Sequence, residues 1–231
     1  MHTYRHMALI FSTFLCAALA QEYAVAQMLP AVAVQTSDRF LGLVPMREVT
    51  EIQRDTEAAE QARLAAVDAE RIAQEERTAA AKLIDEKKQA ININKDRQKA
   101  AKRDKNNAEM LVLGTEGKAL ERDKDMLEER EALRDAEIDL SRKRIELATL
   151  AKQALELEQQ LIAKRIQLPM IVVSGPDSAR EARLMIDLER ATLQAQKKVA
   201  EKQGEVADGA KKVIERQLKT LDAQQGIYSG K

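Results

Sequence analysis

The chain has 231 residues with 38 basic and 38 acidic side chains, so its formal net charge is zero, and only 3% of its residues are aromatic. A compact enzyme domain of this length normally fills its core with several Phe, Tyr and Trp side chains, and Trp is absent here. The 8 glycines and 4 prolines provide few turns. The composition therefore excludes an ordinary globular enzyme and predicts long helices that pack along one another.

The first 26 residues have the pattern of an export signal. Arg5 precedes an apolar run over residues 7–20, and small-x-small cleavage motifs follow at residues 18–20 and, as the favoured site, at 24–26. This run is shorter than the roughly 20 residues that a membrane-spanning helix needs, so a cleaved signal is favoured over a retained anchor. We therefore predict a periplasmic or secreted protein that contacts a membrane only if the signal is not removed.

Cleavage after residue 26 would remove both histidines and the only cysteine, which are His2, His6 and Cys16. The mature chain would then lack the residues for a zinc site of the usual nitrogen and sulfur ligands, for a Ser-His-Asp triad and for a disulfide. Carboxylates such as Glu128 and Glu129 are adjacent on a helix, where their side chains diverge by about 100°. We predict a non-enzymatic protein with no catalytic site, no cofactor and no metal.

The four prolines, at positions 30, 45, 169 and 176, divide the chain, because helices tolerate proline only at their first turn. A capping box formed by Ser178 and Glu181 marks the start of the last helix. We predict a signal peptide at 1–26, an extended segment at 27–46, a helical hairpin at 47–168, a short strand or turn at 169–177, a helix at 178–225 and a frayed tail at 226–231.

The predicted fold is all-α: an elongated, coiled-coil-like antiparallel hairpin plus a third long helix. The hairpin turn is expected near residues 111–117, where Gly114 can take the left-handed conformation that ends a helix and Gly117 follows. One continuous helical rod is the alternative.

Two blocks of charge favour a hairpin. Residues 87–105 contain eight cations and two anions, whereas residues 121–139 contain four cations and nine anions. Folding the chain at Gly114 would place these blocks opposite each other, with Lys105 near Asp123, and wrong registers would bring like charges together.

A seven-residue repeat of apolar residues follows the second half of the hairpin and predicts a coiled-coil seam. Its members are Met126, Leu133, Leu140, Leu147, Ala154, Leu161 and Leu168. Ile138 and Ile145 widen this apolar face, which favours three-helix packing or an oligomer over a parallel dimer. The stripe of the first half, between positions 52 and 91, is mostly alanine, and that of the third helix begins at Leu184 and Leu188. We predict that these seams bind copies of the chain or other envelope proteins.

Two apolar runs, at residues 29–34 and 168–173, flank the hairpin, and each contains a proline followed by β-branched residues. The hairpin would bring both runs to its base, where they could pair into a small sheet. Extended linkers are the alternative.

The order of signal, short strand, helical hairpin and short strand resembles that of the Skp/OmpH-type periplasmic chaperones. The resemblance is architectural and covers residues 29–175. It implies hairpin arms that project from a small β body and hold unfolded outer-membrane proteins. The chain differs from those chaperones in its zero net charge and in its third helix.

The leading functional hypothesis is an exported structural or adaptor component of an envelope or surface assembly. A holdase chaperone for unfolded exported proteins is the alternative. We predict no nucleic-acid partner, because the basic block is balanced by the neighbouring acidic block and lacks interleaved aromatic residues.

Overall fold

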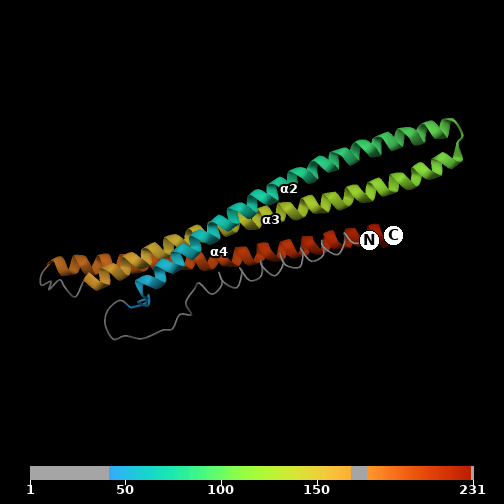
Figure 1. Ribbon diagram of the computed structural model, residues 1–231. Coiled ribbons are helices and arrows are strands. Elements are labelled where there is room, and N and C mark those ends of the chain that lie inside the picture. The colour runs from blue at the N-terminus through green and yellow to red at the C-terminus, as the bar shows by residue number, and fades with distance from the viewer. Residues whose placement is uncertain (1–41, 168–175, 230–231) are drawn as a thin grey trace. The chain divides into compact units, whose positions relative to one another are not determined.

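The computed structural model describes residues 42–167 and 176–229, and all regular secondary structure among them is helical (Figure 1). Helix α2 spans Val49–Arg103, α3 spans Asn107–Gln167 and α4 spans Pro176–Ser229. The predicted all-α class, a helical hairpin with a third long helix, is confirmed. The predicted signal peptide and both predicted extended runs lie outside the described residues.

The described residues form two compact units, and each contains a section of all three helices. Unit 1 comprises residues 42–58 with the described part of Ala151–Lys198, and unit 2 comprises Ala59–Leu150 with the described part of Val199–Lys231. Helix α4 begins at Pro176, two residues before the predicted capping residue, because proline is favoured in the first turn of a helix.

The hairpin turn lies at residues 104–106, so the prediction of a turn near 111–117 was wrong. Lys105 has a φ of 54° and its backbone N–H donates to Lys102 O, while Asn106 N donates to Ala101 O, which together form a Schellman motif at the end of α2. Gly114 and Gly117 lie within α3. Lys105 thus adopts the left-handed conformation that the sequence analysis assigned to Gly114.

The start of α3 explains why the chain turns there. Asn106 Oδ1 accepts a hydrogen bond from Glu109 N at 3.2 Å, and its side-chain amide donates to Glu109 Oε2 at 3.0 Å. Asparagine is among the best N-cap residues, and its side-chain oxygen satisfies one backbone donor of the first turn, Glu109 N, that would otherwise lack a partner. The Asn–Glu cap therefore determines the turn position more strongly than the glycines eight and eleven residues later.

The new turn position changes the register of the hairpin in unit 2. Lys87 Nζ lies 2.6 Å from Asp123 Oδ2, and Arg77 Nε lies 2.7 Å from Asp135 Oδ1. These pairs confirm that α2 and α3 are antiparallel. Lys87, rather than the predicted Lys105, is the partner of Asp123, so the two charge blocks overlap only at their edges.

The buried side of α2 repeats every seven residues and is mostly alanine, as predicted. Its buried members are Ile52, Ala59, Ala66, Ala73, Ala80, Asn94 and Ala101, and Ile84 and Ile91 lie beside them. Small side chains let neighbouring helices approach closely, although each alanine removes little apolar surface from water. Leu83, which lies within the range predicted for this stripe, is 45% exposed.

Helix α3 is buried along two adjacent columns. Leu133, Ala136 and Leu140 form a cluster with Val213 of α4 in unit 2. A neighbouring column contains Leu113, Leu127, Ala148 and Ile162, all buried. A helix needs two such columns when it packs against two neighbours, so the wide apolar face of α3 serves three-helix packing.

The two glycines of α3 give a test of the corrected turn. A Cβ added at Gly114 would have no atom within 4 Å, so Gly114→Ala should raise the free energy of unfolding by about 0.5–1 kcal/mol through helix propensity alone. Urea unfolding followed by circular dichroism measures this change.

Gly117→Ala is the matched control, because a Cβ there would lie 3.0 Å from Asn94 Oδ1 and 3.3 Å from Gln98 Nε2. Gly117→Ala should raise the free energy of unfolding less than Gly114→Ala does, or should lower it. A destabilising Gly114→Ala would contradict the structure, since that is the result expected for a glycine in a left-handed turn.

Candidate interaction surfaces and buried polar sites

A buried polar layer crosses the hairpin near its turn. Asn94 is only 3% exposed and occupies a position of the α2 repeat that is otherwise mostly alanine. Its Nδ2 donates to Glu116 Oε2 at 3.1 Å, and its Oδ1 accepts from Gln98 Nε2 at 2.7 Å. Gln98 Nε2 also donates to Leu113 O at 2.9 Å, and Gly117 leaves space for both amides. A buried asparagine at such a position specifies register, because any shift would leave its amide unpaired.

In unit 1, two side chains bind the backbone of the segment that precedes α2. Glu189 Oε1 accepts hydrogen bonds from Leu43 N at 2.8 Å and from Val44 N at 3.1 Å. Arg165 donates to Val44 O at 2.7 Å and to Glu189 Oε1 at 2.9 Å. Val44 itself is buried with Leu161 and Met185. We call this arrangement the Val44 clamp, and it attaches the segment to both α3 and α4.

The sequence predicted only an extended segment over residues 27–46, and the clamp was missed. The available signal was the position of Arg165 and Glu189, each a charged residue on the side of its helix that carries apolar residues. Charge on such a side predicts a buried partner. The partner is backbone, however, and backbone polar groups leave no signature in a sequence.

A second buried charge cluster in unit 1 surrounds Arg47. Its guanidinium pairs with Asp55 and lies 3.6 Å from Glu158 Oε2. Burial raises the pKa of Glu158, the positive charge of Arg47 partly offsets this rise, and the nearby Asp55 adds to it. The cluster joins the start of α2 to α3. Within the described part of the chain, no group of three or more His, Cys, Asp or Glu side chains could hold a metal ion.

The acidic block of α3 is almost completely paired. Eight of its nine carboxylates take part in a salt bridge, and the partners come from all three helices: Lys87 and Arg77 of α2, Lys124 and Arg134 of α3, and Lys212 and Arg216 of α4. The third helix thus supplies counter-charges that the two-block prediction assigned to residues 87–105.

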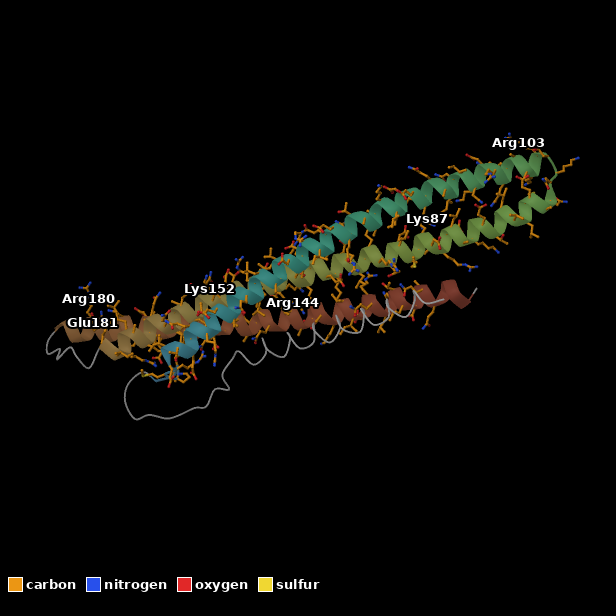
Figure 2. All side chains as sticks on the ribbon, viewed as in Figure 1. Lys87, Arg103, Arg144, Lys152, Arg180 and Glu181 are labelled. Atoms are coloured by element: carbon orange, nitrogen blue, oxygen red, sulfur yellow. The ribbon has the colours of Figure 1, made fainter. Side chains whose placement is uncertain are left out.

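The basic block of α2 is mostly unpaired. Of its eight cations, Lys87, Lys88 and Lys99 form salt bridges. The other five have no salt bridge to any described residue, and all are exposed: Lys95, Arg97, Lys102, Arg103 and Lys105. Figure 2 shows Arg103 at the turn end of the hairpin and Lys87 farther from the turn on α2. The excess positive charge is therefore concentrated at the turn.

Apolar side chains are also exposed in the first turns of α3, which follow the hairpin turn directly. Leu111 is 73% exposed, Val112 is 63% exposed and Met110 precedes them with 36% exposure. We call six of the exposed residues around the turn the tip surface: Lys102, Arg103, Lys105, Met110, Leu111 and Val112. Asp104 and Glu109, which are also exposed, lie between them in the sequence. The tip surface combines positive charge with apolar side chains that the hairpin does not cover.

Helix α4 exposes a second seven-residue repeat in unit 2. Its buried seam includes Val199, Val213 and Thr220, and the residue after each of these is exposed. The exposed repeat is uncharged, and Leu218 lies beside it. We call these residues the outward stripe of α4: Ala200, Ala207, Ile214, Leu218 and Leu221.

The predicted association seam is divided among three environments. Four of its residues are buried in the chain itself: Leu133, Leu140, Leu147 and Leu161. Met126 and Leu188 are half-buried, Leu184 is 49% exposed, and Leu168 lies outside the described residues. The seam of α3 therefore forms internal core. Most of the outward stripe was not predicted. Both faces of α4 carry alanine and leucine repeats, and the sequence does not show which face the other helices cover.

Comparisons with protein-family models, with curated proteins and with solved structures found no match. The function is therefore inferred from the residues of this chain. In the described ranges, no helix has the length and hydropathy to cross a membrane.

The Val44 clamp predicts that Glu189→Ala is strongly destabilising, by about 3–5 kcal/mol, because it leaves Arg165 and two backbone N–H groups without their acceptor. Urea unfolding measures the loss. Asp187→Ala is the control, since Asp187 is exposed on the same helix and should change stability by less than about 0.5 kcal/mol. Equal effects of the two substitutions would refute the clamp.

Glu158 predicts a pH dependence of stability. Its folded-state pKa is raised, so the folded chain binds more protons than the unfolded chain, and this group favours folding most below its ordinary pKa of 4.5. The advantage is lost as pH rises through the folded-state pKa. The stability of the parent chain relative to Glu158→Gln should therefore fall between mildly acidic and neutral pH. Urea unfolding of both proteins across this range tests the sign, and a relative stability that increases with pH would contradict it.

Proposed function

We propose that this chain is a non-enzymatic structural or adaptor protein that is exported and associates with copies of itself through helix α4. The outward stripe of α4 carries this proposal. Ile214, Leu218 and Leu221 are each at least half exposed, and they recur at the spacing of one helix face. Export is supported by the signal pattern of residues 1–26.

The spacing of the stripe favours another helix as its partner. Seven-residue repeats form a straight seam, and Ala200 and Ala207 allow a neighbouring backbone to approach closely along its first half. Ile214 and Leu221 then supply larger side chains along its second half. Burying the exposed half of each large side chain contributes on the order of 1 kcal/mol, so association needs the whole stripe.

The absence of charge on the stripe favours a second copy. Two outward stripes placed against each other would bury no charged side chain of the stripe and would oppose no like charges within it. The internal seams of α2 and α3 are already occupied by the chain's own residues. Association through α4 therefore leaves the packing of both units unchanged.

Light scattering coupled to size-exclusion chromatography tests this proposal. The parent chain should form oligomers, and the variant with Ile214→Ser, Leu218→Ser and Leu221→Ser should shift to the monomer with its helicity retained. The control variant, Leu184→Ser with Ile186→Ser, replaces other exposed apolar residues of α4 and should remain oligomeric. A monomeric parent chain, or an oligomer that survives the stripe substitutions, would eliminate self-association through α4.

A holdase role is a second proposal, and exposed apolar side chains along α2 favour it. Leu64, Ile72 and Leu83 are each 45–51% exposed in unit 2 and could contact an unfolded chain. The discriminating assay is aggregation of a denatured porin in the presence of this protein. Suppression that is lost on substitution of these three residues by serine would support a holdase, and no suppression at stoichiometric excess would discard it.

A further inference from the structure

The unequal pairing of the two charge blocks points to an external anionic partner. The acidic block is paired within the chain, whereas five cations near the turn have no salt bridge among the described residues. Over residues 95–105, six cations and two anions give a net charge of +4. A chain with zero net charge thus presents a local positive surface that its own carboxylates do not neutralise.

The apolar residues of the tip surface indicate which class of anionic partner it binds. Leu111 and Val112 are the most exposed large apolar residues of α3 and follow Lys105 by only six and seven positions. No acidic residue lies between Met110 and Gly114. Exposed aliphatic side chains that follow a group of Lys and Arg are the pattern of segments that bind at a lipid–water interface, where cations contact headgroups and apolar side chains enter the acyl boundary.

We propose that the tip surface binds the anionic headgroups of a phospholipid membrane, with Lys102, Arg103 and Lys105 contacting phosphate and Leu111 and Val112 inserted between headgroups. This goes beyond the proposed function, because it assigns a ligand to a surface that the outward stripe of α4 does not share. The contact is peripheral and requires no membrane-spanning helix.

Lipid fits these residues better than the other anionic partners. A nucleic acid would be bound by the cations, but the aromatic residues that would stack on its bases are absent from residues 95–118. A stable complex with an acidic protein buries about 1,000 Å² or more in total and needs matching contours on both partners. A membrane surface needs no matching contour, so a small tip can bind it.

The expected strength follows from the number of cations. Each Lys or Arg near an anionic bilayer raises the affinity roughly five-fold, so removal of three should lower it about 100-fold. Salt should weaken binding, because these charges are exposed and are screened within about 8–10 Å at physiological ionic strength.

Vesicle flotation with the full chain tests the proposal. Vesicles of phosphatidylcholine containing phosphatidylglycerol should bind the protein, vesicles of phosphatidylcholine alone should not, and added salt should weaken binding. The charge variant (Lys102→Gln, Arg103→Gln, Lys105→Gln) should lose about 100-fold in affinity. The apolar variant (Leu111→Ser, Val112→Ser) should lose about 10-fold, whereas a purely electrostatic contact would be unaffected.

The matched control neutralises three exposed cations elsewhere on the chain, Arg183→Gln, Arg190→Gln and Lys198→Gln, and changes the net charge equally. It should keep the affinity of the parent chain. An equal loss in this control, equal binding to neutral vesicles, or no binding to either would overturn the proposal. So would tighter binding to a DNA duplex or to polyglutamate than to the anionic vesicles at the same salt. Circular dichroism of all variants excludes unfolding as the cause of a loss.

Discussion

The register between α2 and α3 is the constraint on which the other features of unit 2 depend. Two elements set it: the Schellman motif with the Asn106 cap at the turn, and the buried Asn94 amide beyond it. Once this register is fixed, Lys87 meets Asp123, and the acidic block of α3 lies within reach of Arg77 and of α4. The cations nearest the turn are then left without acidic partners. The positive tip surface is therefore a consequence of the register rather than of composition.

The helical class and the three long helices of residues 42–167 and 176–229 could be predicted from the sequence, because proline-free stretches with few glycines leave helix as the available structure. The turn could not be located, because the sequence does not show whether a glycine ends a helix or lies within it. That depends on which side chains pack against the glycine in the folded chain. At Gly117 the neighbours are Asn94 and Gln98, which pack where a Cβ would lie. The stronger signal was the Asn106–Glu109 pair, an asparagine followed three residues later by glutamate.

The candidate sites were predictable only in part. Leu133 and Leu140 were correctly recognised as a seam, but whether a seam faces the chain's own third helix or a partner depends on tertiary packing. The charge blocks misled for the same reason, because Lys212 and Arg216 of α4 neutralise carboxylates that a two-helix argument assigns to α2. The Val44 clamp joins positions more than 120 residues apart through backbone groups, and no local pattern encodes such a contact.

Zero-length cross-linking with a carbodiimide tests the register most directly, because it joins a lysine amine to a carboxylate only where the two already form an ion pair. Peptide mapping of the monomeric fraction should identify an amide between Lys87 and Asp123, whose charged atoms are 2.6 Å apart. A second amide is expected between Lys202 and Glu146, because Lys202 Nζ lies 2.7 Å from Glu146 Oε2. An amide between Lys105 and Asp123 instead would place the turn at Gly114 and contradict the register set by Asn106 and Asn94.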